Sequence, residues 1–492
     1  MNFAFKSMIK ITGILVFITG LFMIPPLGYA LYNHDANCIS AFSIACPFSI
    51  GLGILSFLLT RKASVSLNVR DAHLIVFFSW MVCALIGSFP YYISAHTPNY
   101  ADAIFESVAG YTTTGASSLS EFHMSHSLLL WKAITHWIGA MGMLVFIVTI
   151  LPVGGSGRKS ITLAESPEIN LSSTVPRSKL LARYIYTIYS AMTLLEFILL
   201  YAGSDMNSFE ALITSLGSIS TAGLMPHSDG IAYYNSFYID VVISCFTILA
   251  SVNFMIFIYL VRGNLKEIIK NVEVKVFLAI ITATSLLISI NLFFSKTYDS
   301  FAQALKNAAI QVISFMTTSG FVIVDYSSWP TFCKILLFMM FFIGGCVAST
   351  SGSIKIMRII ILLKLIKRDF FKKLHPRSIQ TIKIGTNNVS AKTVSSITSF
   401  VFLYMGTFLL GTVVISMSGL DMETVLSTTA SLMSTTGSAL GKVGWNGDYS
   451  IFSPGIKLFM SVLMIVGRLE LFSVLMIFFP SFWNTNRAKM VS

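Results

Sequence analysis

Runs of about twenty apolar residues recur from one end of the chain to the other, and this pattern limits the fold more than any other feature. A helix of that length spans the hydrocarbon core of a bilayer. Charged residues make up only 11% of the sequence, which excludes a soluble domain with a solvated surface. The pattern predicts ten membrane spans, near residues 11–33, 41–60, 73–95, 127–151, 184–203, 236–261, 275–294, 331–366, 393–418 and 455–480.

The apolar run at the N-terminus has the length of a membrane span and not that of a secretion signal. Lys6 and Lys10 precede it, as in a signal, but the run contains Pro25 and Pro26 and lacks a small-x-small cleavage site. We therefore interpret it as a retained first span.

Lysine and arginine gather in alternate connections between the predicted spans. The positive-inside rule assigns these connections to the cytoplasm, and with ten spans both termini lie there too. The net charge of +12 thus reflects orientation in the membrane, and we expect contact with anionic lipid headgroups and not with nucleic acid. The basic connections hold Arg61, Lys62 and Arg70; residues 158–183; residues 262–275; residues 364–392; and Arg487 with Lys489.

The opposite connections hold about twice as many acidic as basic residues. An acidic mouth with low-dielectric walls concentrates cations. Alternatively, the outer connections merely avoid Lys and Arg because of the membrane topology, and charge alone does not decide between the two readings.

Four outer segments, each too short or too polar to cross the bilayer, align without gaps. Each opens with a residue suited to a helix start, continues in small and apolar residues, and ends in Ser/Thr-rich backbone that closes on glycine. The closing glycines lie 97 to 117 residues apart, which indicates duplicated units. The segments are DAIFESVAGYTTTG (Asp102 to Gly115), EALITSLGSISTAG (Glu210 to Gly223), NAAIQVISFMTTSG (Asn307 to Gly320) and TVLSTTASLMSTTG (Thr424 to Gly437).

This repeat points to an ion pathway. Irregular backbone at membrane depth is tolerated only where it is buried in protein or lines a wet cavity, so the four loops are expected to converge on one axis. Backbone carbonyls there can replace the water shell of a monovalent cation, and the short helices aim their negative C-terminal ends at the same place. The closing glycines permit a positive φ. Because the segments near the glycines lack carboxylates, an alkali cation fits better than a divalent one.

At these residues the sequence resembles the TrkH/KtrB superfamily of potassium uptake proteins, over nearly the whole chain. Two extra spans before the first repeat make it more similar to the TrkH branch than to the eight-span KtrB branch. The resemblance implies an all-α polytopic protein of the bacterial inner membrane with ten transmembrane helices, two N-terminal helices plus four pseudo-symmetric helix, pore loop, helix units around one central pore. The expected boundaries are 1–70 for the N-terminal helices and 71–183, 184–273, 274–391 and 392–492 for the units.

Carried over by position, the family's potassium-binding filter falls on the four glycine-ended loops. Glycine at the first closing position tends to accompany potassium preference, and Gly115 is glycine. The fourth loop departs from the Asn-Asn pair and the Gly-Pro-Gly expected of TrkH members. The implied filter residues are Thr112, Thr113, Thr114, Gly115, Ser220, Thr221, Ala222, Gly223, Thr317, Thr318, Ser319, Gly320, Ser434, Thr435, Thr436 and Gly437.

A run of glycines and small residues interrupts the long span of the third unit, near residues 344–354. Such a run predicts a broken helix, and its family counterpart is an intramembrane gate loop beneath the filter. The alternative is a kink that lets helices pack closely. The gate candidates are Gly344, Gly345, Ser349, Gly352, Lys355 and Arg468.

Arg468 is a charge inside the last predicted span, where an unpaired charge is costly. In a cation pathway it raises a local barrier by repulsion, and the family places an arginine in this neighbourhood. The alternative is a buried pair with Glu470 or with another carboxylate such as Glu196. Residues two apart do not share a helix face, which disfavours Glu470.

The implied partners are a second copy of the chain, giving a homodimer, and cytoplasmic nucleotide-binding regulatory subunits of the TrkA type, which face the basic connection from Lys364 to Lys392. The sequence has no Walker motif or G-x-G-x-x-G fingerprint, so nucleotide sensing belongs to that partner. His123, His126 and His136 lack supporting cysteines or carboxylates, so we expect no further metal site.

The chief alternative function is a symporter that couples potassium uptake to H⁺ or Na⁺. Secondary transporters also use broken helices, but their repeats are usually inverted or paired and their sites often carry intramembrane carboxylates. A membrane enzyme is the other alternative, and no pairing of a nucleophile with a base stands out. We therefore expect a transport protein that carries K⁺, with no organic cofactor and no catalytic residue.

Overall fold

The computed structural model describes residues 5–61, 69–119, 124–142, 178–227, 229–378, 380–385, 387–445 and 447–483. Within these ranges the chain is helical apart from one short antiparallel strand pair, β1 (Lys383–Ile384) with β2 (Asn387–Asn388). Six helical stretches are long and apolar enough to cross a bilayer, or eight when each of two sharply bent helix pairs counts as one span. The all-α membrane fold is therefore confirmed, whereas the number of ten spans stays a prediction.

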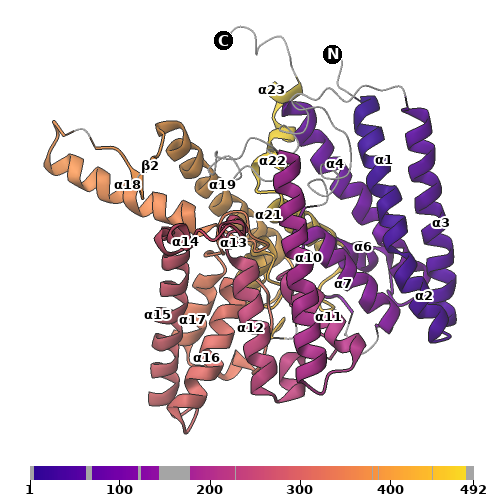
Figure 1. The fold of residues 1–492 in the computed structure, drawn as a ribbon, viewed down its shortest axis with the longest axis horizontal. Coiled ribbons are helices and arrows are strands. Elements are labelled where there is room, and N and C mark those ends of the chain that lie inside the picture. Colours follow the sequence, from indigo (N-terminus) through magenta and orange to yellow (C-terminus); the bar gives the residue numbers. More distant parts are fainter. Residues whose placement is uncertain are drawn as a thin grey trace.

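The N-terminal helices form a hairpin at one edge of the molecule (Figure 1). Helix α1 (Phe5–Phe22) continues as α2 (Ile24–Tyr32) and packs against α3 (Ala36–Leu59), whose first turn is capped by the Asp35 carboxylate. Glycine makes this packing close, because a Cβ at Gly53 would lie 2.7 Å from the backbone nitrogen of Phe17.

Each of the four following units has a long helix, a short buried helix and a further helix. The long helices are α4 (Val69–Gly87) with α5 (Phe89–Ile93), α10 (Ser178–Gly203), α15 (Val272–Phe294) and α19 (Ala391–Ser416). The short helices are α6 (Tyr100–Tyr111), α11 (Ser208–Ile219), α16 (Phe301–Met316) and α20 (Met422–Ser434). The further helices are α7 (His126–Ala140), α12 (Phe237–Ser251), α17 (Thr331–Met340) and α21 (Pro454–Arg468).

Polar side chains cap the N-termini of three of the four short helices. Asn99, Asn207 and Asp421 each accept a hydrogen bond from a backbone N–H in the first turn, and these bonds satisfy donors that a helix start leaves free. The predicted starts lie within two residues of those in the structure, except in the third unit. Helix α16 begins at Phe301 and not at Asn307, because the apolar pattern continues backwards through that turn.

In the second, third and fourth units, the helix that follows the short helix is broken near the middle of its span. The sequence predicted such a break in the third unit alone. Helix α12 is followed after a bend of 101° by α13 (Met255–Val261), and α21 is followed after a bend of 114° by α22 (Phe472–Leu475). The second bend contains two consecutive residues with positive φ, Glu470 and Leu471, which no helix accommodates. Each bent pair together has the length and apolar character of a membrane span, so the spans predicted at 236–261 and 455–480 contain bends that the sequence did not predict.

The units are arranged so that the last one packs against the first. Helix α21 lies on α6, while α7 lies on α11 and α12 lies on α16. After the break in the third unit, α18 (Ile356–Leu374) and the β1–β2 hairpin extend sideways from the bundle, in orange at the left of Figure 1. The remaining elements of the described chain are α14 (Leu265–Lys270), α23 (Pro480–Trp483) and the 3-10 turns η3 (Gly230–Tyr234), η4 (Tyr326–Ser328) and η5 (Met476–Phe478).

Candidate functional site

The four glycine-ended loops lie together as a closed ring. Loop 1 is Thr112–Gly115, loop 2 is Ser220–Gly223, loop 3 is Thr317–Gly320 and loop 4 is Ser434–Gly437, and their hydroxyl-bearing residues are buried. Each closing glycine abuts the backbone of the next loop. A Cβ on these glycines would meet the Ala222 oxygen from Gly115, the Ser319 oxygen from Gly223, the Thr436 oxygen from Gly320 and the Gly115 backbone from Gly437.

The second residue of every loop adopts the left-handed conformation, and in every loop it is threonine. The φ angles are 57° at Thr113, 52° at Thr221, 58° at Thr318 and 61° at Thr435. The sequence reasoning assigned positive φ to the closing glycines, which holds in loops 2, 3 and 4, whereas Gly115 lies outside that region. Threonine at this position gives no sequence signal for a positive φ, because a β-branched residue disfavours that conformation.

The first and third hydroxyls of three loops bind each other. The oxygen-to-oxygen distances are 2.9 Å for Thr112 with Thr114, 3.2 Å for Thr317 with Ser319, and 2.7 Å for Ser434 with Thr436. Loop 2 carries Ala222 at its third position and lacks this pair. These bonds hold the side chains of the first and third residues against their own loop.

The closing glycines of loops 1, 2 and 3 line a small vestibule at one side of the ring. Its lining also includes Ser438, just after loop 4, and side chains of the segments that follow the loops. The lining residues are Gly115, Gly223, Met225, His227, Gly230, Gly320, Val322, Ser438, Trp445 and Gly447.

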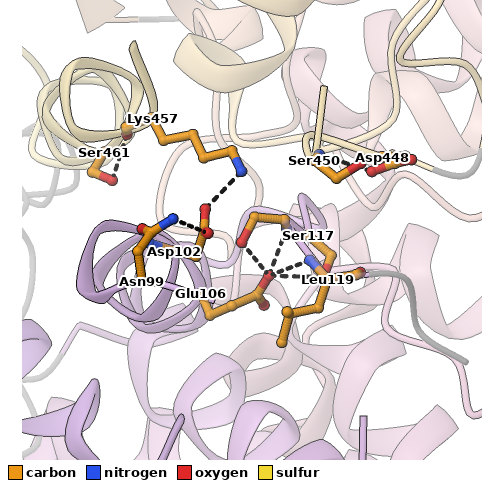
Figure 2. A network of polar contacts seen from close by, with 10 residues as sticks. Asn99, Asp102, Glu106, Ser117, Leu119, Asp448, Ser450, Lys457 and Ser461 are labelled. Carbon is orange, nitrogen blue, oxygen red and sulfur yellow. Dashed lines mark hydrogen bonds and ion pairs between the residues drawn. The ribbon is translucent and has the colours of Figure 1, made fainter. Parts of the chain in front are cut away.

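A buried carboxylate holds the segment that leaves loop 1 (Figure 2). Glu106 accepts hydrogen bonds from the Ser118 amide at 2.6 Å and the Ser117 hydroxyl at 2.8 Å, and also from the Leu119 amide. Lys132 donates to its second oxygen at 2.7 Å and to the Ala116 carbonyl at 3.1 Å. A lysine inside the predicted span 127–151 was the sequence signal for this network, and the sequence reasoning missed it.

Ion pairs join neighbouring units at three of the four short helices. Asp102 of α6 binds Lys457 of α21 at 2.6 Å, and both side chains are buried (Figure 2). Lys306 of α16 binds Asp240 of α12 at 2.7 Å, and Glu423 of α20 binds Lys334 of α17 at 3.1 Å. Each of these carboxylates is thus paired with a lysine of a neighbouring unit.

Four of the six residues predicted as a gate, Gly344, Gly345, Ser349 and Gly352, lie in one loop, Gly344–Ser353, which we call the inner loop. The Gly352 amide donates to the Thr318 hydroxyl at 2.8 Å. A Cβ on Gly352 would clash with the Ser434 carbonyl oxygen of loop 4. The inner loop therefore contacts loops 3 and 4 directly, with no room for a larger residue.

Other helices anchor the inner loop. The Cys346 amide donates to the Ser251 carbonyl at 2.9 Å, at the break between α12 and α13. The buried Glu273 carboxylate, in the first turn of α15, accepts from the Val347 amide at 2.7 Å.

The loop also binds itself. The Gly344 amide donates to the Ile354 carbonyl and the Gly345 amide to the Ser351 hydroxyl, while Ser349 donates to the Cys346 carbonyl and Lys355 to the Ser351 carbonyl. The four predicted residues of the loop, together with Lys355, thus lie in one hydrogen-bonded turn.

Arg468 ends α21 beside the inner loop. Its guanidinium donates to the Thr350 carbonyl at 2.9 Å and to the Gly139 carbonyl at 3.0 Å, so it joins the inner loop to the end of α7. Glu470, which lies beyond the end of α21, binds Arg358 of α18. The guanidinium adds a positive charge beneath the ring.

The histidines of the sequence do not form a metal site where they are described. His126 and His136 are ten residues apart on α7, about 15 Å along a helix axis. His126 packs edge-on against Phe209, with ring centroids 5.1 Å apart, and His136 is buried. His123 lies outside the described residues, as do Lys62, most of the basic connection 158–183, Arg487 and Lys489.

Comparisons with known proteins agree with one another. Residues 39–485 match the family model described as TrkH, cation transport protein. The chain is 31% identical to the Trk system potassium uptake protein TrkH of Halomonas elongata, over 97% of this chain and 99% of that protein. It is 30% identical to the protein of the same name from Escherichia coli K12, over 98% of this chain and 99% of that one.

A solved structure matches the fold. The crystal structure of the potassium transporter TrkH from Vibrio parahaemolyticus aligns with a TM-score of 0.88 at 28% sequence identity, and the alignment covers 98% of this chain and 100% of that chain. The matches to sequence and to structure span almost the full chain. The chain therefore belongs to the TrkH family of cation transport proteins.

Proposed function

We propose that this protein takes up potassium across the bacterial inner membrane, through a channel-like path along the centre of the ring formed by loops 1 to 4. The observation that carries the proposal is the ring itself. Four loops of irregular backbone meet inside an apolar helical protein, where such backbone must be buried or line a wet cavity. The names of the relatives, potassium uptake proteins and not enzymes, support potassium as the transported ion.

The main-chain oxygens of the sixteen loop residues act as the selectivity filter. They are neutral, and together they replace the hydration shell of an alkali cation. The hydroxyl pairs in loops 1, 3 and 4 support this assignment, because they hold the side chains away from the path. The C-terminal ends of the four short helices point their partial negative charge at the ion.

The inner loop is the gate. Gly352 blocks the path by its contacts with Thr318 and Ser434, and Gly344 and Gly345 allow the loop to leave it. Ser349 and Lys355 hold the loop in its closed shape. Arg468 adds an electrostatic barrier and ties the closed loop to α7.

The membrane arrangement has ten spans with both termini in the cytoplasm, and the units have the boundaries given by the repeat. Two copies of the chain associate, and cytoplasmic subunits of the TrkA type control opening from the side of the basic connection 364–392. The basic residues of α18 also contact anionic lipid headgroups. The charge distribution and the sideways extension of α18 support this arrangement (Figure 1).

Growth rescue of a potassium-auxotrophic strain tests the proposal. The parent protein is expected to restore growth at low potassium, and Gly115→Ser is expected to reduce the preference for potassium over sodium. The reason is steric, since a Cβ at this position lies 2.6 Å from the Ala222 carbonyl oxygen. Failure of the parent to rescue, or an unchanged ion preference in the variant, would contradict the filter assignment.

Flux into proteoliposomes separates a channel from a symporter. A channel gives ⁸⁶Rb⁺ uptake that follows the membrane potential whether or not a proton or sodium gradient is present. Uptake that requires either gradient would favour the symporter.

A further inference from the structure

Two segments of the outer connections repeat the same three residues. Asp325-Tyr326-Ser327 follows loop 3, and Asp448-Tyr449-Ser450 follows loop 4. In both, the aspartate accepts a hydrogen bond from the serine amide at 2.8 Å. The two tyrosines therefore start from the same local turn.

Both tyrosine rings are fixed against a phenylalanine of a short helix. Tyr326 packs on Phe315 of α16 with ring centroids 5.5 Å apart, and Tyr449 packs on Phe105 of α6 at 5.4 Å. Each tyrosine is 1% exposed or less. The two rings are thus packed tightly against the short helices of the first and third units, which are the neighbours of the fourth.

One hydroxyl binds a main-chain oxygen of loop 4, and the other binds a main-chain oxygen two residues after it. The Tyr449 hydroxyl donates to the Gly437 carbonyl at 2.8 Å, and the Tyr326 hydroxyl donates to the Ala439 carbonyl, also at 2.8 Å. Burial raises the pKa of each phenol above its ordinary value, so each remains a donor at physiological pH.

The support behind Tyr449 reaches back to loop 1. Its backbone amide donates to the Ser117 carbonyl at 2.8 Å, and the Ser117 amide donates to the Gly447 carbonyl at 3.2 Å. Figure 2 shows this segment, marked by Asp448 and Ser450, beside the Glu106 network that holds Ser117. The tyrosine is therefore anchored to the first unit by main-chain bonds and by its ring.

We propose that Tyr326 and Tyr449 are positioning residues that set the width of the ion path at loop 4 and thereby its preference for potassium over sodium. This rests on the proposed function. A carbonyl oxygen has two acceptor positions, so Gly437 can bind Tyr449 with one and face the path with the other. Released from the hydroxyl, it can move inward and coordinate the smaller ion.

Removal of the hydroxyls alone tests the proposal. Tyr326→Phe, Tyr449→Phe and the double variant keep both rings on their phenylalanines. In proteoliposomes, the ratio of ⁸⁶Rb⁺ to ²²Na⁺ uptake is expected to fall about threefold in each single variant and about tenfold in the double variant, in keeping with the net worth of one and two hydrogen bonds. The ⁸⁶Rb⁺ uptake itself is expected to stay within about twofold of the parent, because the path remains open.

Tyr91→Phe is the matched control. Tyr91 is a fully buried tyrosine of α5 whose hydroxyl has no hydrogen-bond partner among the described residues, so its removal is expected to leave the uptake ratio unchanged. A fall of the ratio in this control as large as in the test variants would overturn the proposal, since loss of a buried hydroxyl at any place would then suffice.

A second measurement covers a variant that folds poorly. The melting temperature of the purified protein is expected to rise more in potassium than in sodium, and this difference is expected to shrink in either single variant, so one well-folded variant is enough. An unchanged uptake ratio and an unchanged difference in melting temperature would overturn the proposal. A parent that transports neither ion would instead refute the proposed function on which the inference rests.

Discussion

The ring of loops 1 to 4 and the inner loop beneath it are built in opposite ways. The ring consists of four copies with threonine at the second position and glycine at the fourth. The inner loop occurs once, in the third unit, and its contacts all differ: a hydroxyl of loop 3, a carboxylate of α15 and a guanidinium of α21. Copies provide equivalent oxygens around an ion, whereas a single loop can move while the ring keeps its shape.

The two regions also differ in how their atoms are held. In the ring, backbone meets backbone without room for a methyl group. The inner loop also meets backbone closely at Gly344 and Gly352, but its anchors to α12, α15 and α21 are separate hydrogen bonds, each with a net worth of about 1 kcal/mol. The comparison predicts that changes in the ring stop transport, and that changes around the inner loop release it.

The largest expected effect belongs to Gly223→Ala. Its Cβ would clash with the Ser319 carbonyl oxygen, at a residue with a φ of 69°. If the steric clash destabilises the conducting form of the ring by about 3 kcal/mol, ⁸⁶Rb⁺ uptake is expected to fall about 100-fold. Gly406→Ala in α19, where a Cβ meets no atom within 4 Å, is the control and is expected to behave as the parent. Uptake near the parent's level in Gly223→Ala would contradict close backbone packing of the ring.

The next effect belongs to Arg468→Gln. It removes the positive charge beneath the ring and weakens the bonds to Thr350 and Gly139. Hydrogen bonds to charged groups contribute about 1.5–3 kcal/mol, so basal uptake is expected to rise about tenfold. Arg468→Lys keeps the positive charge and loses the paired geometry of the guanidinium hydrogen bonds. Basal uptake near the parent's level in this variant would indicate that the charge is the barrier, and raised uptake would indicate that the hydrogen bonds hold the loop closed. Uptake by Arg468→Gln equal to or below the parent's, at equal expression, would count against both roles.

A smaller increase is expected for Glu273→Ala. This change removes one acceptor of the inner loop, the one that binds the Val347 amide, and leaves the other anchors in place. A net loss of about 0.5–1.5 kcal/mol predicts a rise in basal uptake of about threefold. Glu273→Gln keeps a carbonyl oxygen at the same place and serves as the matched control. If both variants transport alike, the carboxylate is not an anchor of the closed loop.

The smallest effect is expected for Lys334→Met. The pair of Lys334 with Glu423 is partly exposed, and such pairs contribute about 0–1 kcal/mol. Thermal unfolding is expected to change little. Lys457→Met, which leaves Asp102 buried and unpaired, is the contrasting variant and is expected to cost about 3–5 kcal/mol. Equal destabilisation by both changes would show that burial does not determine how much these ion pairs contribute to the free energy of unfolding.

The fold followed from the sequence wherever a pattern is repeated. Apolar runs predicted the membrane class, and the aligned glycines predicted that Gly115, Gly223, Gly320 and Gly437 lie together, as the structure has them. The interruption at residues 344–354 predicted the break between α17 and α18. Apolar periodicity and internal duplication occur several times within this one sequence, so they can be recognised without comparison with other sequences.

Contacts between distant, unlike residues could not be predicted in this way. The partners of Arg468 are main-chain oxygens, which carry no sequence signature. The sequence predicted no bend after α12 or α21, because neither place has a run of glycines and small residues like that near 344–354. The positive φ of Thr113 and its equivalents is imposed by the ring, against the preference of a β-branched residue.

The pair of Asp102 with Lys457 joins residues 355 positions apart. At a translation rate of about 5–20 residues per second, Lys457 is therefore synthesised about 20–70 s after Asp102. During that interval a carboxylate of the first unit has no final partner, and a chain cut short never supplies one. The first unit therefore reaches its final packing only after most of the fourth unit has been synthesised, and a chain that ends before Lys457 lacks this ion pair.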